Sequence, residues 1–183
     1  MVEVWWIQML GTGLTAAMIN QLAQWFIQRR RDRLASRNAA LTTCVKLEAY
    51  AVACAEAATE IHAYLDDPEH ETEPSYSIPD FEGLPDGEDL RHMPMSLAAQ
   101  ILNFPLVVSF HRSYLYSCWK HSGPPQTLEW AREEIALVGY RGHVLATDIA
   151  RMYGFRAWTP ALPDWDFVSV LERHKRSVDL KRV

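Results

Sequence analysis

Apolar residues along this chain recur most regularly between positions 128 and 152. They alternate steps of three and four residues, as on one face of an α-helix, at Leu128, Ala131, Ile135, Val138, Gly142, Leu145, Ile149 and Met152. A seam of about 25 residues with this period is typical of antiparallel helical bundles. Gly154 follows, where a helix commonly ends. The pattern predicts a long helix in which Gly139 and Gly142 admit a bulky neighbour, with Trp119 and Trp130 as candidates.

A second amphipathic helix is predicted for residues 38–65. Its apolar positions again lie three or four residues apart, at Leu47, Tyr50, Ala51, Cys54, Ala58, Ile61 and Leu65. Lys46, Glu56 and Glu60 fall on the opposite side. The many alanines favour a helix and permit close approach by a neighbouring one. We therefore expect one buried stripe that faces a bundle.

Shorter elements complete the expected bundle. Residues 95–103 predict a short helix, and Pro105 suits the first turn of the next one, which extends to about residue 121. A last helix is expected to begin at Asp164 and to bury Phe167, Val168 and Leu171. No run of alternating apolar and polar residues predicts a strand. The fold class is therefore all-α, with an antiparallel helical bundle.

The beginning of the chain differs from the rest because it carries no charge between Val4 and Gln28. Trp5 and Trp6 open this stretch and Trp25 closes it. About 20 helical residues cover about 30 Å, which is the thickness of the hydrocarbon core of a bilayer. Tryptophan rings prefer the headgroup level of a membrane. Residues 1–28 thus predict a transmembrane anchor helix that contacts the lipid through residues 4–27.

A cluster of arginines directly after this stretch gives the expected anchor an orientation. The cluster consists of Arg29, Arg30, Arg31 and Arg33. Positive residues beside a span are retained in the cytoplasm. We expect a single-pass protein of the bacterial inner membrane, with its N-terminus outside and its C-terminal domain in the cytoplasm. A cleaved signal peptide is disfavoured, because its positive residues would precede the apolar segment.

Two other interpretations of the first segment stay open, because polar residues and glycines interrupt it. It could form the first core helix of a soluble bundle, or lie as an amphipathic helix on a membrane surface. Polar residues occupy more than one face, which weakens the surface helix. Gly13 and Ala17 form a pair of small residues that could bring two copies together as a homodimer.

Composition places residues 29–183 in one cytoplasmic helical domain. The chain has 183 residues, of which 49% are hydrophobic and 22% charged, as in ordinary globular proteins. The net charge of -5 is concentrated, because ten acids and one base lie between Asp66 and His92. Five prolines disfavour regular structure over residues 66–94. We expect a partly ordered acidic loop that faces a protein partner, and no nucleic-acid binding because the chain is acidic overall.

The sequence contains no familiar catalytic motif in a context that would support an enzyme. Gly11, Gly13 and Ala16 match a dinucleotide-binding fingerprint, but no strand precedes them, so no cofactor is expected. The cysteines Cys44, Cys54 and Cys118 lack metal-ligand spacing. No phosphate-binding loop, nucleophile elbow or zinc-protease motif occurs. We expect no metal, and the sequence disfavours catalysis without excluding it.

One segment is dense enough in aromatic and titratable residues to form a pocket. His111, Tyr114 and His121 are its candidate pocket residues, because polar groups beside aromatic rings are typical of ligand sites. The interpretation that we favour is instead that Tyr114, Cys118 and Trp119 pack inward while His111, Arg112 and Lys120 are solvated. An enzyme of unfamiliar type that uses residues 111–121 is therefore kept as a second hypothesis.

The order of these features resembles small bacterial proteins without an assigned function. The resemblance rests on the N-terminal segment, the arginine cluster, the strings Leu47-Glu48-x-Tyr50-Ala and Cys54-Ala, the acidic loop, and Tyr153-Gly154. It implies a helical domain anchored in the inner membrane and transfers no catalytic or binding residue. The sequence thus favours a membrane-tethered interaction or regulatory module over an enzyme or a soluble bundle.

Overall fold

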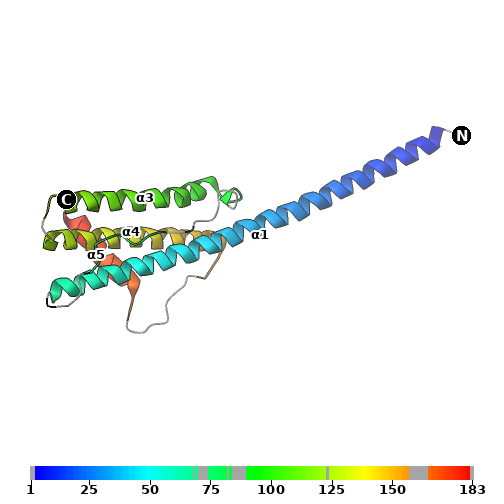
Figure 1. Cartoon of the computed structure of the whole chain (residues 1–183). Coiled ribbons are helices and arrows are strands. Elements are labelled where there is room, and N and C mark those ends of the chain that lie inside the picture. Colours follow the sequence, from blue (N-terminus) through cyan, green and yellow to red (C-terminus); the bar gives the residue numbers. More distant parts are fainter. Residues whose placement is uncertain are drawn as a thin grey trace.

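The structure is a computed structural model that describes residues 3–67, 69, 74–81, 83, 90–122, 124–156 and 165–181. Residues 3–17, 124–125 and 175–181 are described by their backbone alone. This part of the chain contains helices α1 (Glu3–Asp66), α3 (Met95–Trp119), α4 (Pro124–Tyr153) and α5 (Phe167–Lys181), and no strand (Figure 1). The all-α prediction is confirmed.

Helix α1 is one continuous helix of 64 residues, which includes both the N-terminal segment and the helix predicted over residues 38–65. Neither glycine nor proline occurs between Leu14 and Asp66, so nothing interrupts the backbone hydrogen bonds. In Figure 1 the C-terminal half of α1 lies along the other helices, whereas the N-terminal half extends far beyond them. Side chains 18–31 are all exposed, and Ser36 is the first buried one. Residues 18–31 therefore do not form a core helix of this bundle.

The structure does not support the transmembrane span predicted for the N-terminal segment. None of the helices, as far as they are described, is both long enough and apolar enough to cross a bilayer. Polar residues explain this result, because Gln8, Asn20, Gln21 and Gln24 lower the mean hydropathy of a stretch that is uncharged.

Helix α3 also joins two expected elements, since it continues through Pro105. Proline removes one amide donor from a helix, but the turns on both sides of this residue keep their contacts with the core. Ile101, Phe104 and Val108 are buried on one face. The break expected between residue 103 and Pro105 does not occur, and both positions lie inside α3.

The helices pack most closely where α1 crosses α4. A Cβ atom added at Gly139 would lie 2.5 Å from the Cβ of Cys54, and one at Gly142 would lie 3.2 Å from Cζ of Phe104. The two glycines do admit neighbours, but Trp119 and Trp130 were the wrong candidates. Cys54 reaches this position because it lies on the buried, alanine-rich stripe of α1, which permits close approach.

The end of α4 and the start of α5 each have a local cause. Gly154 ends α4 with a positive φ of 66°, as expected of glycine after a helix. Helix α5 begins at Phe167, and Asp166 caps it by accepting bonds from the Val168 amide, at 3.1 Å, and from the Ser169 hydroxyl. The predicted cap, Asp164, lies outside the described residues. Phe167 and Leu171 are buried as predicted, whereas Val168 is only half-buried.

Candidate functional site

Two of the three predicted pocket residues meet at a groove between α3 and α4. His111 and Tyr114 line a cavity of about 690 Å³ together with Leu106, Val107 and Phe110 of α3. His121 does not line it, because this residue follows the end of α3 about three turns further along. Its side chain is exposed. The structure thus brings His111 and Tyr114 together and leaves His121 apart.

Helix α4 supplies the polar groups that orient His111. The carboxylate of Glu134 contacts Nδ1 of His111, and the guanidinium of Arg141 lies 3.0 Å from Nε2 of His111. His111 and Glu134 are 5% and 4% exposed, whereas Arg141 is exposed. With a neutral ring, Nδ1 donates to the carboxylate and Nε2 accepts from Arg141.

This arrangement suits binding better than proton transfer. A general base needs a nitrogen within hydrogen-bond reach of the substrate proton. Here both nitrogens of His111 already have protein partners, Glu134 and Arg141. Arg141 holds the outer position, from which a positive guanidinium faces the groove. The chemistry available at the surface of the groove is therefore recognition of an anion.

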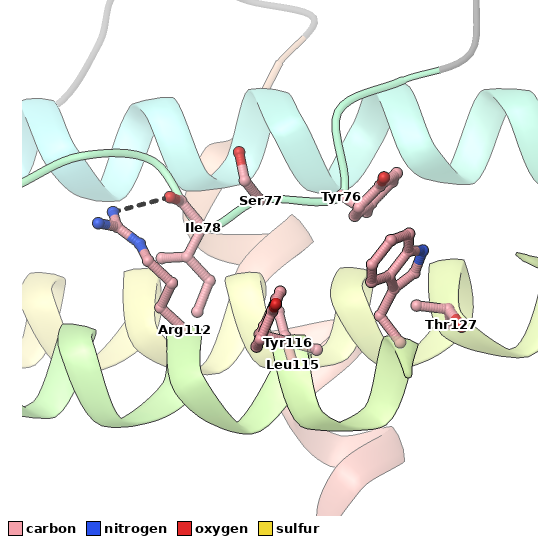
Figure 2. A pocket seen from close by; sticks show the side chains of 8 residues that line it. Tyr76, Ser77, Ile78, Arg112, Leu115, Tyr116 and Thr127 are labelled. Carbon is pink, nitrogen blue, oxygen red and sulfur yellow. Dashed lines mark hydrogen bonds between the residues drawn. The ribbon is translucent and has the colours of Figure 1, made fainter. Parts of the chain in front are cut away.

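A second hollow, of about 240 Å³, lies between α3 and the segment 74–81 (Figure 2). Its walls are mostly aromatic, since the rings of Tyr76 and Tyr116 both stack with Trp119, with centroids 6.2 and 6.3 Å away. Arg112 closes one end, as Figure 2 shows. The hollow is small and lined by residues that already contact one another.

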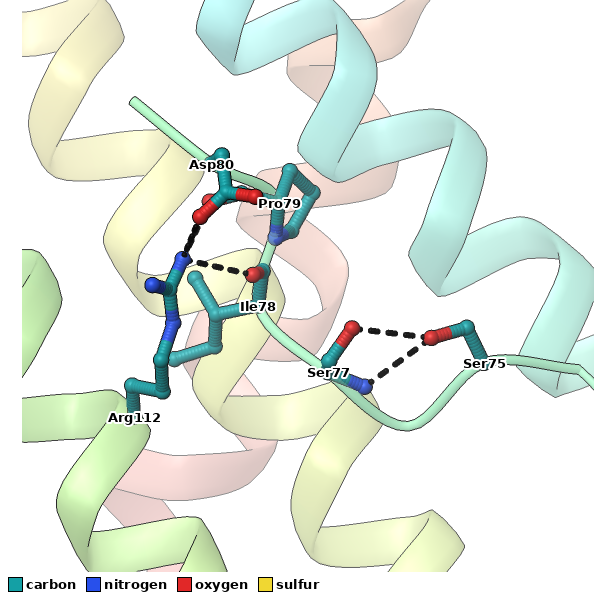
Figure 3. A network of polar contacts seen from close by, with 6 residues as sticks. All are labelled: Ser75, Ser77, Ile78, Pro79, Asp80 and Arg112. Carbon is teal, nitrogen blue, oxygen red and sulfur yellow. Dashed lines mark hydrogen bonds and ion pairs between the residues drawn. The ribbon is translucent and has the colours of Figure 1, made fainter. Parts of the chain in front are cut away.

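Arg112 ties segment 74–81 to α3, so this part of the acidic loop is a docked strap (Figure 3). Its guanidinium donates to the carbonyl oxygens of Ile78 and Pro79, at 3.1 and 3.3 Å, and to the carboxylate of Asp80 at 2.7 Å. Ile78 is 2% exposed, and Phe81 packs edge-to-face with Phe104. This segment of the predicted loop therefore packs against the bundle.

Most of the acidic residues expected to face a partner lie outside the described part. Those without a description are Glu71, Glu73, Glu82, Asp86, Glu88 and Asp89. Asp66, Asp67 and Glu69 are exposed, and Asp80 is held by Arg112. The acidic loop is therefore described where it contacts the bundle and where it leaves α1.

Two further histidines lie between helices, His174 buried and His143 half-buried. Nδ1 of His143 in α4 lies 3.1 Å from the carboxylate of Glu48 in α1, and this hydrogen bond raises the pKa of His143. Burial, and then the charge of Arg132, lowers the pKa of His174 in α5 to about 4. No group of three or more metal-ligating side chains occurs among the described residues. These histidines join helices.

The predicted membrane-contacting residues lie on the uncovered half of α1. Only the backbone of Trp5 and Trp6 is described, so their expected contacts lie outside the described side chains. Trp25 is exposed, and the guanidinium of Arg29 lies 4.5 Å from its ring centroid. Arg30, Arg31 and Arg33 are exposed on the following turns. The apolar side chains next to them have no cover, and Phe26 is 63% exposed.

Sequence reasoning missed the two residues of α4 that complete the His111 site. Glu134 and Arg141 are seven residues apart, which is two helical turns, so they lie on one face. Each is adjacent to the apolar seam, beside Ile135 and Gly142. Charges at the edge of such a seam were the available signal. Comparisons of the chain with protein family models, curated proteins and solved structures find no match.

Proposed function

We propose that this protein is an interaction module whose helical bundle is attached to a lipid bilayer by the N-terminal half of α1. The observation that carries the proposal is the uncovered helix itself. Met18, Ile19, Leu22, Phe26 and Ile27 are all more than half exposed, although their apolar surfaces favour burial. Contact with the apolar part of a bilayer would cover these side chains.

Charge supports the same attachment. Residues 4–28 carry no charge, and the arginine cluster that follows would meet anionic headgroups, at about 1 kcal/mol per residue near the surface. The cation–π contact between Arg29 and Trp25 places a basic and an amphipathic side chain at one level of the helix. The arginines favour a cytoplasmic bundle.

Fractionation of membranes from expressing cells tests the attachment. We expect the full chain to sediment with membranes and to resist extraction by salt. The double variant Ile19→Lys/Leu22→Lys should shift the protein to the supernatant, because lysine is costly in hydrocarbon. The matched control is Leu34→Lys/Leu41→Lys, which alters two exposed residues of α1 after the arginines. The control should remain bound.

Two results contradict the attachment. One is recovery of the unaltered chain in the supernatant without detergent. The other is release by the control pair alone. Because Leu34 and Leu41 follow the arginines, that result would mean that apolar contacts between copies of α1, and not the bilayer, hold the protein in the pellet. Protease added from each side of sealed vesicles tests the expected orientation, in which the bundle is cut only from the cytoplasmic face.

Within the module, the acidic loop is proposed as the element that faces a protein partner. Deleting residues 68–92 would also remove Ile78 and Phe81, which pack on the bundle. A sharper variant replaces Glu69, Glu71, Glu73, Asp86, Glu88 and Asp89 by their amides and keeps the strap. Crosslinked partners should then be lost while the melting temperature is kept. Unchanged crosslinking would show that the charges of the loop do not bind the partner.

A further inference from the structure

The groove between α3 and α4 has a polar floor that is unusual for a helical interface. His111 and Glu134 are both more than nine-tenths buried, yet both are titratable. Burying such a pair costs desolvation, and apolar residues of similar volume often stabilise a core at least as well. The pair therefore calls for an explanation beyond stability. Its position at the floor of the 690 Å³ cavity provides one.

Arg141 is the part of this site that is presented to a ligand. It uses one nitrogen for His111 Nε2, and among the described side chains no carboxylate forms an ion pair with it. Glu134, two turns away, is engaged by His111. Asp148, two turns away in the other direction, pairs with Arg151 at 3.2 Å. Arg141 thus offers planar N–H donors of the kind that hold a carboxylate through two parallel bonds.

The wall beside Arg141 is apolar. Leu106 and Phe110 are 67% and 70% exposed, and Val107 lies between them. Leu106 and Phe110 thus present most of their apolar surface to the groove or to solvent, and the cavity falls in the size range of small-molecule sites. A ligand that satisfies both surfaces carries one carboxylate and an apolar body.

We propose that this groove binds a small organic carboxylate, with its carboxylate on Arg141 and its aromatic or branched apolar body on Leu106, Val107 and Phe110. His111 is a positioning residue, since it fixes the guanidinium and is itself fixed by Glu134. Tyr114 also lines the groove. The site is independent of the membrane attachment, because it lies wholly within the bundle.

The test compares two probes of nearly equal shape, 4-phenylbutyrate and its uncharged amide, on the full-length protein by calorimetric titration. The acid should bind with a Kd below about 1 mM, and the amide about tenfold more weakly, because it cannot form the charged pair. Arg141→Gln should weaken the acid by about tenfold and leave the amide unchanged. Phe110→Ala should weaken both probes.

Arg112→Gln is the matched control, because it removes a guanidinium from the neighbouring face of α3 without touching this groove. It should leave the affinity for the acid unchanged. Equal binding of acid and amide to the unaltered protein would overturn the proposal without any variant, and so would no binding of either probe. Retention of full affinity by Arg141→Gln, or selective capture of an acidic peptide in place of the acid, would overturn it as well.

Discussion

The two halves of α1 have similar secondary structure and opposite surroundings. In the first half, every side chain from Met18 to Arg31 is exposed. In the second half, Leu47, Ala51 and Ala58 are completely buried against the bundle. The second half carries a buried stripe of alanines and larger apolar residues, and its own exposed Leu34, Leu41 and Val45 lie on the opposite side. Exposed apolar residues thus occur in both halves, and the alanine-rich stripe distinguishes the half that the bundle covers.

The comparison predicts its largest difference for leucines in the two halves. Leu47→Ala should lower the free energy of unfolding by about 3 kcal/mol, because it removes a buried side chain and leaves a cavity. Leu22→Ala should change it by less than about 0.5 kcal/mol, because that leucine is 54% exposed. Urea denaturation followed by circular dichroism measures both. Equal effects would mean that the first half is also covered.

Acid should act on the covered half through His174, whose ring lies 6.0 Å from that of His62 in α1. The pKa of His174 is about 4 in the fold, against 6.5 for a free histidine, so the unfolded chain takes up the proton first. Stability should therefore fall as the pH is lowered from 6.5 to 4, by about 2–3 kcal/mol, and fall no further through this group below pH 4. Thermal melts across this range measure the loss.

The variant His174→Gln provides the control for that titration, because glutamine does not bind a proton. Its stability should be flatter between pH 6.5 and 4 than that of the unaltered chain. An equally steep decline in the variant would assign the acid sensitivity to other groups.

The crossing of α1 and α4 gives a smaller but more specific contrast. Gly139→Ala should destabilise the bundle by about 2 kcal/mol, because the new methyl group would overlap Cys54. Gly142→Ala should cost less than about 1 kcal/mol, since it meets the end of the Phe104 ring and gains helix propensity. Chemical denaturation of the two variants ranks them. The reverse order would contradict the crossing as described.

The smallest expected effect marks the boundary between the halves. The hydroxyl groups of Ser36 and Tyr153 are 2.6 Å apart, and Ser36 is the first buried residue of α1 among the described side chains. Tyr153→Phe should lower stability by about 1 kcal/mol through loss of this hydrogen bond. Hydrogen exchange should increase around residue 36 and stay unchanged near residue 60. Uniform acceleration along α1 would show that the boundary is not local.

Much of the bundle was predictable from periodicity, because a single buried stripe leaves a pattern in the sequence. The seam of α4 was predicted with Gly154 at its end, and the core stripe of α1 is buried from Leu47 to Ile61. The joins between elements were predicted less well. Pro105 predicts a boundary between two helices, but core contacts of the turns on both sides keep α3 continuous.

The candidate site was only half predictable. The density of aromatic and titratable residues identified His111 and Tyr114, but it also included His121. That residue does not line the groove, because it lies about three helical turns beyond His111. Glu134 and Arg141 come from another helix, and their distance from His111 depends on how α3 and α4 pack. Spacing within one element cannot supply such a distance.

The continuity of α1 also has a rotational consequence. Each residue of an α-helix turns the chain by about 100° and advances it by about 1.5 Å. No glycine or proline interrupts the helix after Gly13. The orientation of the bundle about the axis of α1 is therefore fixed relative to any surface that contacts the first turns of this helix. One residue inserted between Arg33 and Ser36 would rotate the groove on α3 and α4 about the axis of α1 by more than a quarter turn. An insertion that adds a whole number of helical turns would restore its orientation.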